Sequence, residues 1–404
     1  MRPSANESAN LDALRATAVL CVLLSHLSDT ITGNLGDFAW HVGRLGVLMF
    51  FVHTSLVLMF SMERLKLEGW ALAGTFYIRR WFRIYPLSIV CVVFMYYWMR
   101  SFWAPARAWT GADLWADLTL TQNLFNRDNV IGVLWSLPLE VQMYLFLPAL
   151  FLLGRRLSIR WMIGIWLAAL PLGAIASRVS DRINVFEYAP CFIAGVLAWR
   201  LIRRGIVPKL PSWLWPIAMV SPGVIWMIAP QEPQQNLVHR WLVCIALALM
   251  IPAFKELTWK PLNVFSHVVA KYSYGIYLSH VCAFVFVYYA RKMYPSVPLA
   301  AVWACCGVMV VGVPVVLYHC VEEPFIGLGR RISQRWLEFY QTNRAAKTGQ
   351  VRAIEISGSG DTVCSSEPVT NRGFVHIPDH RGRFSHGIQI ATTTIDDDER
   401  SSGA

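Results

Sequence analysis

The sequence predicts an all-α membrane protein, a polytopic bundle of about ten transmembrane helices. Of the 404 residues, 55% are hydrophobic and only 15% are charged, which is too apolar for an ordinary soluble enzyme. Apolar runs of about 20 residues, the length that crosses a bilayer as a helix, recur along most of the chain. The runs are continuous rather than alternating, so they do not match the strands of a membrane barrel.

Ten such runs are separated by stretches that carry charged residues, Gly, Asn or Pro. In order, they cover residues 11–31, 42–62, 82–100, 130–153, 159–177, 185–202, 212–229, 238–254, 269–290 and 298–319. The sixth and the eighth are short. Each run is expected to be a helix, because a backbone inside lipid must satisfy its own hydrogen bonds.

The chain has a net charge of +11, and its Lys and Arg residues are distributed unevenly between the loops that connect these runs. The loops on the same side as the N-terminus hold 20 Lys and Arg, whereas the loops on the other side hold 9. By the positive-inside rule, both termini are cytoplasmic in a multi-pass protein of the cell (inner or plasma) membrane. The basic residues form no patch interleaved with aromatics on a soluble domain, so we expect no nucleic-acid partner.

The nine cysteines lie mainly inside the apolar runs, as small buried side chains would. Their spacing matches neither a disulfide framework nor a metal site, and no metal is expected. After residue 338 the composition becomes polar and rich in Ser, Thr and acidic residues. We therefore predict a transmembrane domain over 1–338 and a disordered cytoplasmic tail over 339–404.

Ionisable residues inside the apolar runs indicate a site, because each costs about 2.5–3.5 kcal/mol at the centre of a membrane helix. Arg15 and His26 are eleven residues apart, so they share one helical stripe and differ by about 16 Å in depth. A snorkelling arginine and a core histidine would also explain this pair.

Two further clusters have helical spacing. Arg80 and Arg83, at i and i+3, suit the phosphates of a cytosolic ligand, although lipid head groups attract such clusters as well. Ser136, Glu140 and Tyr144 share one face of the fourth run, at a depth where Glu140 could meet His26. A structural ion pair is the alternative for Glu140.

Other polar side chains converge from two more runs. His53 and Thr54 lie in the second run, and KYSYGIYLSH in the ninth carries several tyrosines and His280. So many polar groups suggest a cavity, which favours an enzyme or a transporter of a polar or anionic solute; a lipid-binding module is a third reading.

Six motifs in order over residues 9–335 resemble the acyltransferase 3 family, which includes bacterial O-antigen and exopolysaccharide O-acetyltransferases. They are LDALRATAVLCVLLSH, GVLMFFV, FYIRRWFRIYP, LWSLPLEVQMYL, SYGIYLSH and VEEPF. Arg15 and His26 match the family's Arg-x10-His element, Arg80 and Arg83 its Arg-x-x-Arg element, and Glu322 with Pro324 its Glu-x-Pro element. The chain departs from the common pattern at His53, Ser55 and Glu323, which suggests a divergent branch and leaves the acceptor substrate open.

The resemblance implies O-acetylation: transfer of an acyl group, most often acetyl from acetyl-CoA, to a carbohydrate or glycoconjugate acceptor. We expect Arg80 and Arg83 to hold the acyl-CoA and Arg15 to orient its thioester. His26 would deprotonate the acceptor hydroxyl and Glu140 would orient the imidazole; an acyl-histidine intermediate is the alternative route. Ser136, Tyr144, His280 and His53 are expected to contact the substrates.

Overall fold

The computed structural model describes residues 8–33, 36–102, 109–205, 209–232 and 235–358. The chain divides into two compact units, Met1–Thr342 and Asn343–Ala404, and the description below concerns the first. In the described residues all regular elements are helices, apart from one isolated bridge between Leu210 and Phe254. The predicted all-α fold is confirmed.

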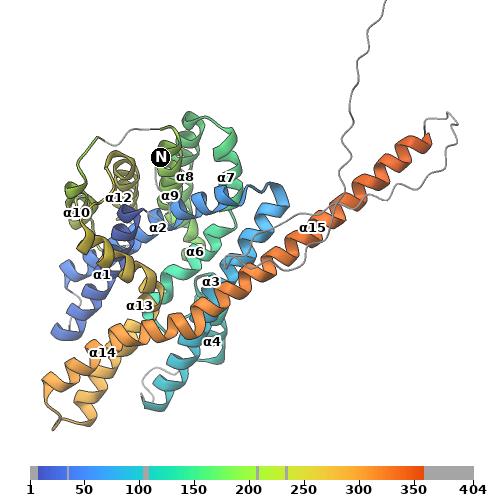
Figure 1. Cartoon of the computed structure of the whole chain (residues 1–404). Coiled ribbons are helices and arrows are strands. Elements are labelled where there is room, and N and C mark those ends of the chain that lie inside the picture. The colour runs from blue at the N-terminus through green and yellow to red at the C-terminus, as the bar shows by residue number, and fades with distance from the viewer. Residues whose placement is uncertain (1–7, 34–35, 103–108, 206–208, 233–234, 359–404) are drawn as a thin grey trace, which may run out of the picture. The chain divides into compact units, whose positions relative to one another are not determined.

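Seven long helical segments are apolar enough to cross a membrane in the described part of the chain, and a bent pair makes eight. The main elements are α1 (Ala9–Thr32), α2 (Asp37–Leu65), α3 (Gly69–Phe102), α6 (Leu137–Tyr144) with α7 (Leu147–Arg156), α8 (Ile159–Val179), α9 (Val185–Arg203), α12 (Leu237–Met250), α13 (Lys260–Met293), α14 (Leu299–Leu317) and α15 (Glu323–Gly358) (Figure 1). The bend of 49° lies between α6 and α7.

The remaining two predicted spans are shorter but still traverse the bundle. Trp215 at the start of α10 (Trp215–Val220) donates to Asn10 O at the start of α1, and Trp226 in α11 (Gly223–Met227) donates to His41 O at the start of α2. The first turns of α1 and α2 lie at opposite ends of the bundle, because these consecutive helices run antiparallel. The segment 212–229 therefore crosses from one end to the other.

Helix α12 makes the return crossing. Arg240 in its first turns pairs with Glu187 near the start of α9, and Ala253 just after its end accepts a hydrogen bond from Leu210 N at 3.1 Å. All ten predicted runs thus coincide with helical segments. Breaks at Pro222 and Pro252 explain why the helices of the seventh and eighth runs are short, whereas the sixth run forms the full-length helix α9.

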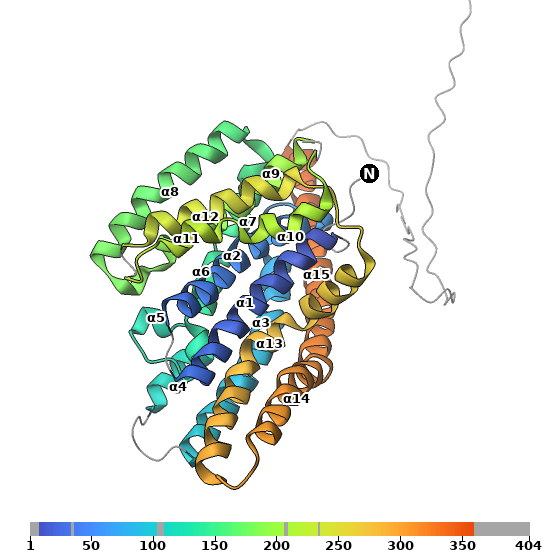
Figure 2. The ribbon, with the colours of Figure 1, turned by 90° about the vertical axis from the view of Figure 1, so that its left-hand side faces the viewer.

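Helices α1 and α13 lie side by side in the bundle (Figure 2). They run in the same direction, because their side chains meet in the same order along both helices, at three levels. His267 meets Asp12, Arg15 meets Ser273, and His26 meets His280. Helix α2 packs on α1 at Gly46, where a Cβ would collide with the Ala18 carbonyl, so the two backbones approach closely as in other membrane helix pairs. This packing sets the positions of the site residues on α1, α2 and α13.

Helix α3 begins earlier than predicted, at Gly69 rather than near residue 82. Arg80 and Arg83 therefore lie inside a long helix and not at the entrance to one. Arginines lower hydropathy without lowering helix propensity, so the apolar run marked only the apolar part of the helix and not its start. At the C-terminal end, α15 continues past residue 338, where the tail is predicted to begin; most of that predicted disorder, over 359–404, lies outside the described residues.

Candidate active site

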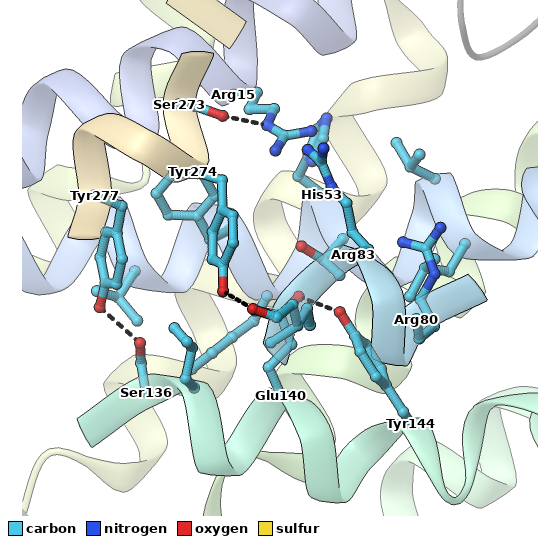
Figure 3. A pocket seen from close by; sticks show the side chains of 18 residues that line it. Arg15, His53, Arg80, Arg83, Ser136, Glu140, Tyr144, Ser273, Tyr274 and Tyr277 are labelled. Carbon is cyan, nitrogen blue, oxygen red and sulfur yellow. Dashed lines mark hydrogen bonds between the residues drawn. The ribbon is translucent and has the colours of Figure 1, made fainter. Parts of the chain in front are cut away.

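A polar cavity lies between α1, α2, α3, α6 and α13 and measures about 760 Å³ including the space at its mouth (Figure 3). We call it the main cavity. Its polar lining residues are Arg15, His53, Thr54, Arg80, Arg83, Ser136, Glu140, Tyr144, Ser273, Tyr274 and Tyr277. Seven of the nine residues predicted for the site therefore meet here, and His26 and His280 do not line it.

The arginines of the main cavity differ in their partners. Arg15 Nε donates to Ser273 Oγ at 2.6 Å, which fixes its guanidinium against α13. Arg83 forms an ion pair with Glu322, whose side chain is fully buried and belongs to the π-helical turn Tyr318–Glu322 before α15. Arg80 faces Glu140 and Tyr144, as Figure 3 shows. Arg79 points elsewhere, since its Nε donates to Ser333 Oγ.

Glu140 is held by its own helix. It lies in the first turn of α6, where the positive end of the helix dipole stabilises a carboxylate, and it accepts a hydrogen bond of 2.5 Å from the Tyr144 hydroxyl. The spacing of i and i+4 predicted from the sequence thus corresponds to a direct contact. With three arginines and one glutamate in its lining, the main cavity carries an excess of positive charge.

Ser136 and Tyr277 close the main cavity on the side of α13. The Tyr277 hydroxyl lies 2.7 Å from Ser136 Oγ and donates at 2.7 Å to Val133 O. Because a phenol has one hydrogen, Ser136 is the donor in the bond between the two hydroxyls. Both side chains are buried and both hydroxyl hydrogens are used, and we call this pair the wall of the main cavity.

His26 lies beyond that wall, in a second cavity of about 1380 Å³ including its open side. The second cavity is lined by His26, Asp29, Thr30, Tyr288, Arg291 and Lys292 among others, at the end of α1 opposite Arg15. His26 and Glu140 thus line different cavities, and the expected contact between them is absent from this structure. His280 stands between the cavities, with ring centroids 5.2 Å from His26 and 6.3 Å from Tyr277.

Several lining residues were not singled out in the sequence. Ser273 follows Tyr272 in KYSYGIYLSH, and helical periodicity would have grouped 273, 277 and 280 on one face. Tyr272 lies on another face, where its hydroxyl is 3.3 Å from His319 Nε2, and Ser279 bonds its own helix at Gly275 O. Asp29, Arg291 and Lys292 line the second cavity, but in the sequence they resemble ordinary helix-end residues, and no motif marks them as part of a site.

Comparison with known proteins identifies the family. A family model described as an acyltransferase domain matches residues 8–319, more than half of the chain. The chain belongs to the acyltransferase 3 family. Nodulation protein 10 of Rhizobium leguminosarum bv. viciae is 26% identical over 331 residues, which cover 70% of this chain and 85% of that relative. No solved structure is significantly similar to the chain.

As a member of the acyltransferase 3 family, the protein is a multi-pass membrane acyltransferase. The matched region runs from the first turn of α1 to the end of α14 and includes both cavities; Glu322 lies just beyond it. In the described residues no group of three or more His, Cys, Asp or Glu is arranged to hold a metal ion.

Proposed function

We propose that this acyltransferase moves an acyl group, acetyl in the simplest case, from acyl-CoA to a hydroxyl of a carbohydrate or glycoconjugate at the cell membrane. The observation that carries the proposal is the pair of cavities: one holds the arginines, and the other holds His26. A two-substrate transfer needs a site for each substrate and a group that can accept a proton.

The main cavity suits the acyl-CoA. Coenzyme A carries phosphates, and guanidinium groups bind phosphate oxygens through two parallel hydrogen bonds. Arg80 is the best candidate for this contact, because Arg83 already pairs with Glu322. Arg15, anchored on Ser273, would bind the thioester oxygen or a phosphate deeper in the cavity.

The second cavity suits the acceptor. Its polar lining offers both hydrogen-bond donors and acceptors, as hydroxyl-rich molecules require, and its volume exceeds that of the main cavity. His26 is half-buried at its edge, where an acceptor hydroxyl could reach the ring.

The chemistry needs few groups. His26 takes the proton of the acceptor hydroxyl as the oxygen attacks the thioester carbonyl, and the departing thiolate takes that proton back. Arginine donors near the carbonyl oxygen stabilise the charge that forms there. Tyr277 of the wall and His280 lie between the main cavity and His26, so these side chains must shift for donor and acceptor to meet.

The proposal is tested with purified protein in liposomes, radiolabelled acetyl-CoA, and glycan extracts from cells that lack the protein. We expect release of CoA thiol together with label in the glycan fraction. Mass spectrometry of envelope glycans from cells with and without the protein then identifies the acceptor through mass differences of one acyl group. Flux of solute without consumption of acetyl-CoA would instead support a transporter.

A further inference from the structure

His280 is a buried histidine with one occupied and one unoccupied nitrogen. It lies on α13 with 1% of its surface exposed, and its Nδ1 is 2.8 Å from Ile276 O. A carbonyl oxygen can only accept, so Nδ1 carries the hydrogen. In the neutral ring Nε2 is then a bare acceptor, and it is buried without a hydrogen-bond partner among the described residues.

A buried acceptor without a donor destabilises a protein, so its presence calls for a donor that arrives during function. Three rings surround His280: His26, Tyr277 and Phe284. The hydroxyl hydrogen of Tyr277 is used at Val133 O, and phenylalanine has no polar hydrogen to give. The remaining ring is His26, whose centroid is 5.2 Å away at a tilt of 46°.

We propose that His280 is a positioning residue that accepts a hydrogen bond from the N–H of His26 during acyl transfer. A small rotation of either ring at this separation brings facing nitrogens within the range of about 2.7–3.2 Å that hydrogen bonds require. This contact would hold His26 in the tautomer whose bare nitrogen faces the second cavity. The inference rests on the proposed function and adds to it a residue that touches neither substrate.

The proton balance is simple. The O–H bond of the acceptor breaks, its proton moves to the bare nitrogen of His26, and the oxygen forms a bond to the thioester carbon. The C–S bond then breaks, and the thiolate takes the proton from His26. His280 neither gains nor loses a proton; its Nε2 only accepts the hydrogen bond from the other nitrogen of His26. Without this bond, His26 can adopt either tautomer, which lowers the fraction of competent enzyme.

Two variants of similar length separate hydrogen bonding from packing. His280→Gln keeps an acceptor oxygen near the position of Nε2, whereas His280→Met fills the space with no strong acceptor. We expect His280→Met to lower kcat about tenfold or more, with the KM for acetyl-CoA within about twofold of wild type, and His280→Gln to retain clearly more activity. His267→Gln, at the exposed start of the same helix, is the control and should match wild type.

The readouts are kcat and KM with labelled acetyl-CoA and the glycan extract, together with thermal unfolding of each purified variant. Wild-type turnover in His280→Met would overturn the inference. An equal loss of turnover in His280→Met and His280→Gln, accompanied by a loss of thermal stability in both, would overturn it as well. If His280→Met does not accumulate, His280→Gln alone decides: turnover as low as that of His26→Ala would contradict the role. Absence of transfer by the wild-type protein would count against the proposed function itself, which is a different result.

Discussion

The pair of Arg240 and Glu187 and the charged residues of the main cavity both lie inside the helical bundle, and they differ in the balance of charge. At the junction of α9 and α12, Arg240 and Glu187 pair one to one at 3.2 Å, both nearly fully buried, and Arg240 also packs over the Tyr188 ring. In the main cavity three arginines face one lining glutamate and the paired Glu322, around open space. A matched pair needs no ligand, whereas an excess of positive charge in a cavity favours an anionic one.

The largest effect is expected at His26, which belongs to neither set. His26→Ala should lower acyl transfer by about 10²–10⁴-fold, the usual contribution of a general base, while binding of acetyl-CoA stays at the wild-type level. The second result follows because His26 does not line the main cavity. Turnover and donor binding are measured on the same preparation, and near-normal turnover in a well-folded His26→Ala protein would remove its role.

Replacement of Arg80 should weaken the binding of acetyl-CoA without any other large effect. Arg80→Ala is expected to raise the KM for acetyl-CoA by about 10–100-fold, which corresponds to the loss of one charge-assisted contact of about 1.5–3 kcal/mol. Arg80→Lys should restore part of the affinity, because lysine keeps the charge but cannot form the two parallel hydrogen bonds of a guanidinium group. An unchanged KM in Arg80→Ala would assign this arginine to membrane anchoring.

Arg83 lines the main cavity and also pairs with a buried carboxylate, so its loss should affect the stability of the fold. Arg83→Met leaves Glu322 buried without its partner and should lower the stability of the fold by about 3–5 kcal/mol. The double variant Arg83→Met with Glu322→Met removes both charges and should recover most of that stability. Thermal unfolding in detergent measures both, and a double variant less stable than the single one would show that the pair is not the cause.

Arg240 gives the contrasting case. Arg240→Met should lower stability by a similar mechanism, since Glu187 loses its partner, yet leave the KM for acetyl-CoA unchanged. A matched assay with Arg80→Ala makes the contrast quantitative. A rise in the donor KM of Arg240→Met comparable to that of Arg80→Ala would mean that the two regions do not differ in function.

The smallest effect is expected from the tail. A chain that ends at Thr342, where the first compact unit ends, retains both cavities and every side chain assigned a role above. Its rate of acyl transfer should remain within about twofold of the full-length rate, since no residue that lines either cavity lies beyond residue 342. Normal acetyl-CoA binding with lost turnover would instead show that residues beyond 342 contribute to the reaction.

The sequence predicted the ten helical segments because helix formation in lipid depends on local apolar length, which a single run of residues contains. Among the described residues, seven of the segments and one bent pair have the length and composition of a membrane span. It also predicted the shared face of Glu140 and Tyr144, since helical spacing fixes it. It could not predict that Glu322 pairs with Arg83, because 239 positions separate them and only packing brings them together. Nor could spacing separate Arg15 from His26: one stripe gives a common face and a depth difference, but the side chains between them, Tyr277 bonded to Ser136 and the neighbouring His280, are brought together only by packing.

If the main cavity is the donor site, the purified protein binds acetyl-CoA through Arg80, and direct binding of acetyl-CoA tests this most directly. Titration calorimetry would compare the wild type with Arg80→Ala and Arg240→Met, each checked for folding by thermal unfolding. We predict equal affinities for the wild type and Arg240→Met and an affinity about tenfold or more weaker for Arg80→Ala. Equal binding by all three proteins, or no binding by the wild type, would contradict the assignment.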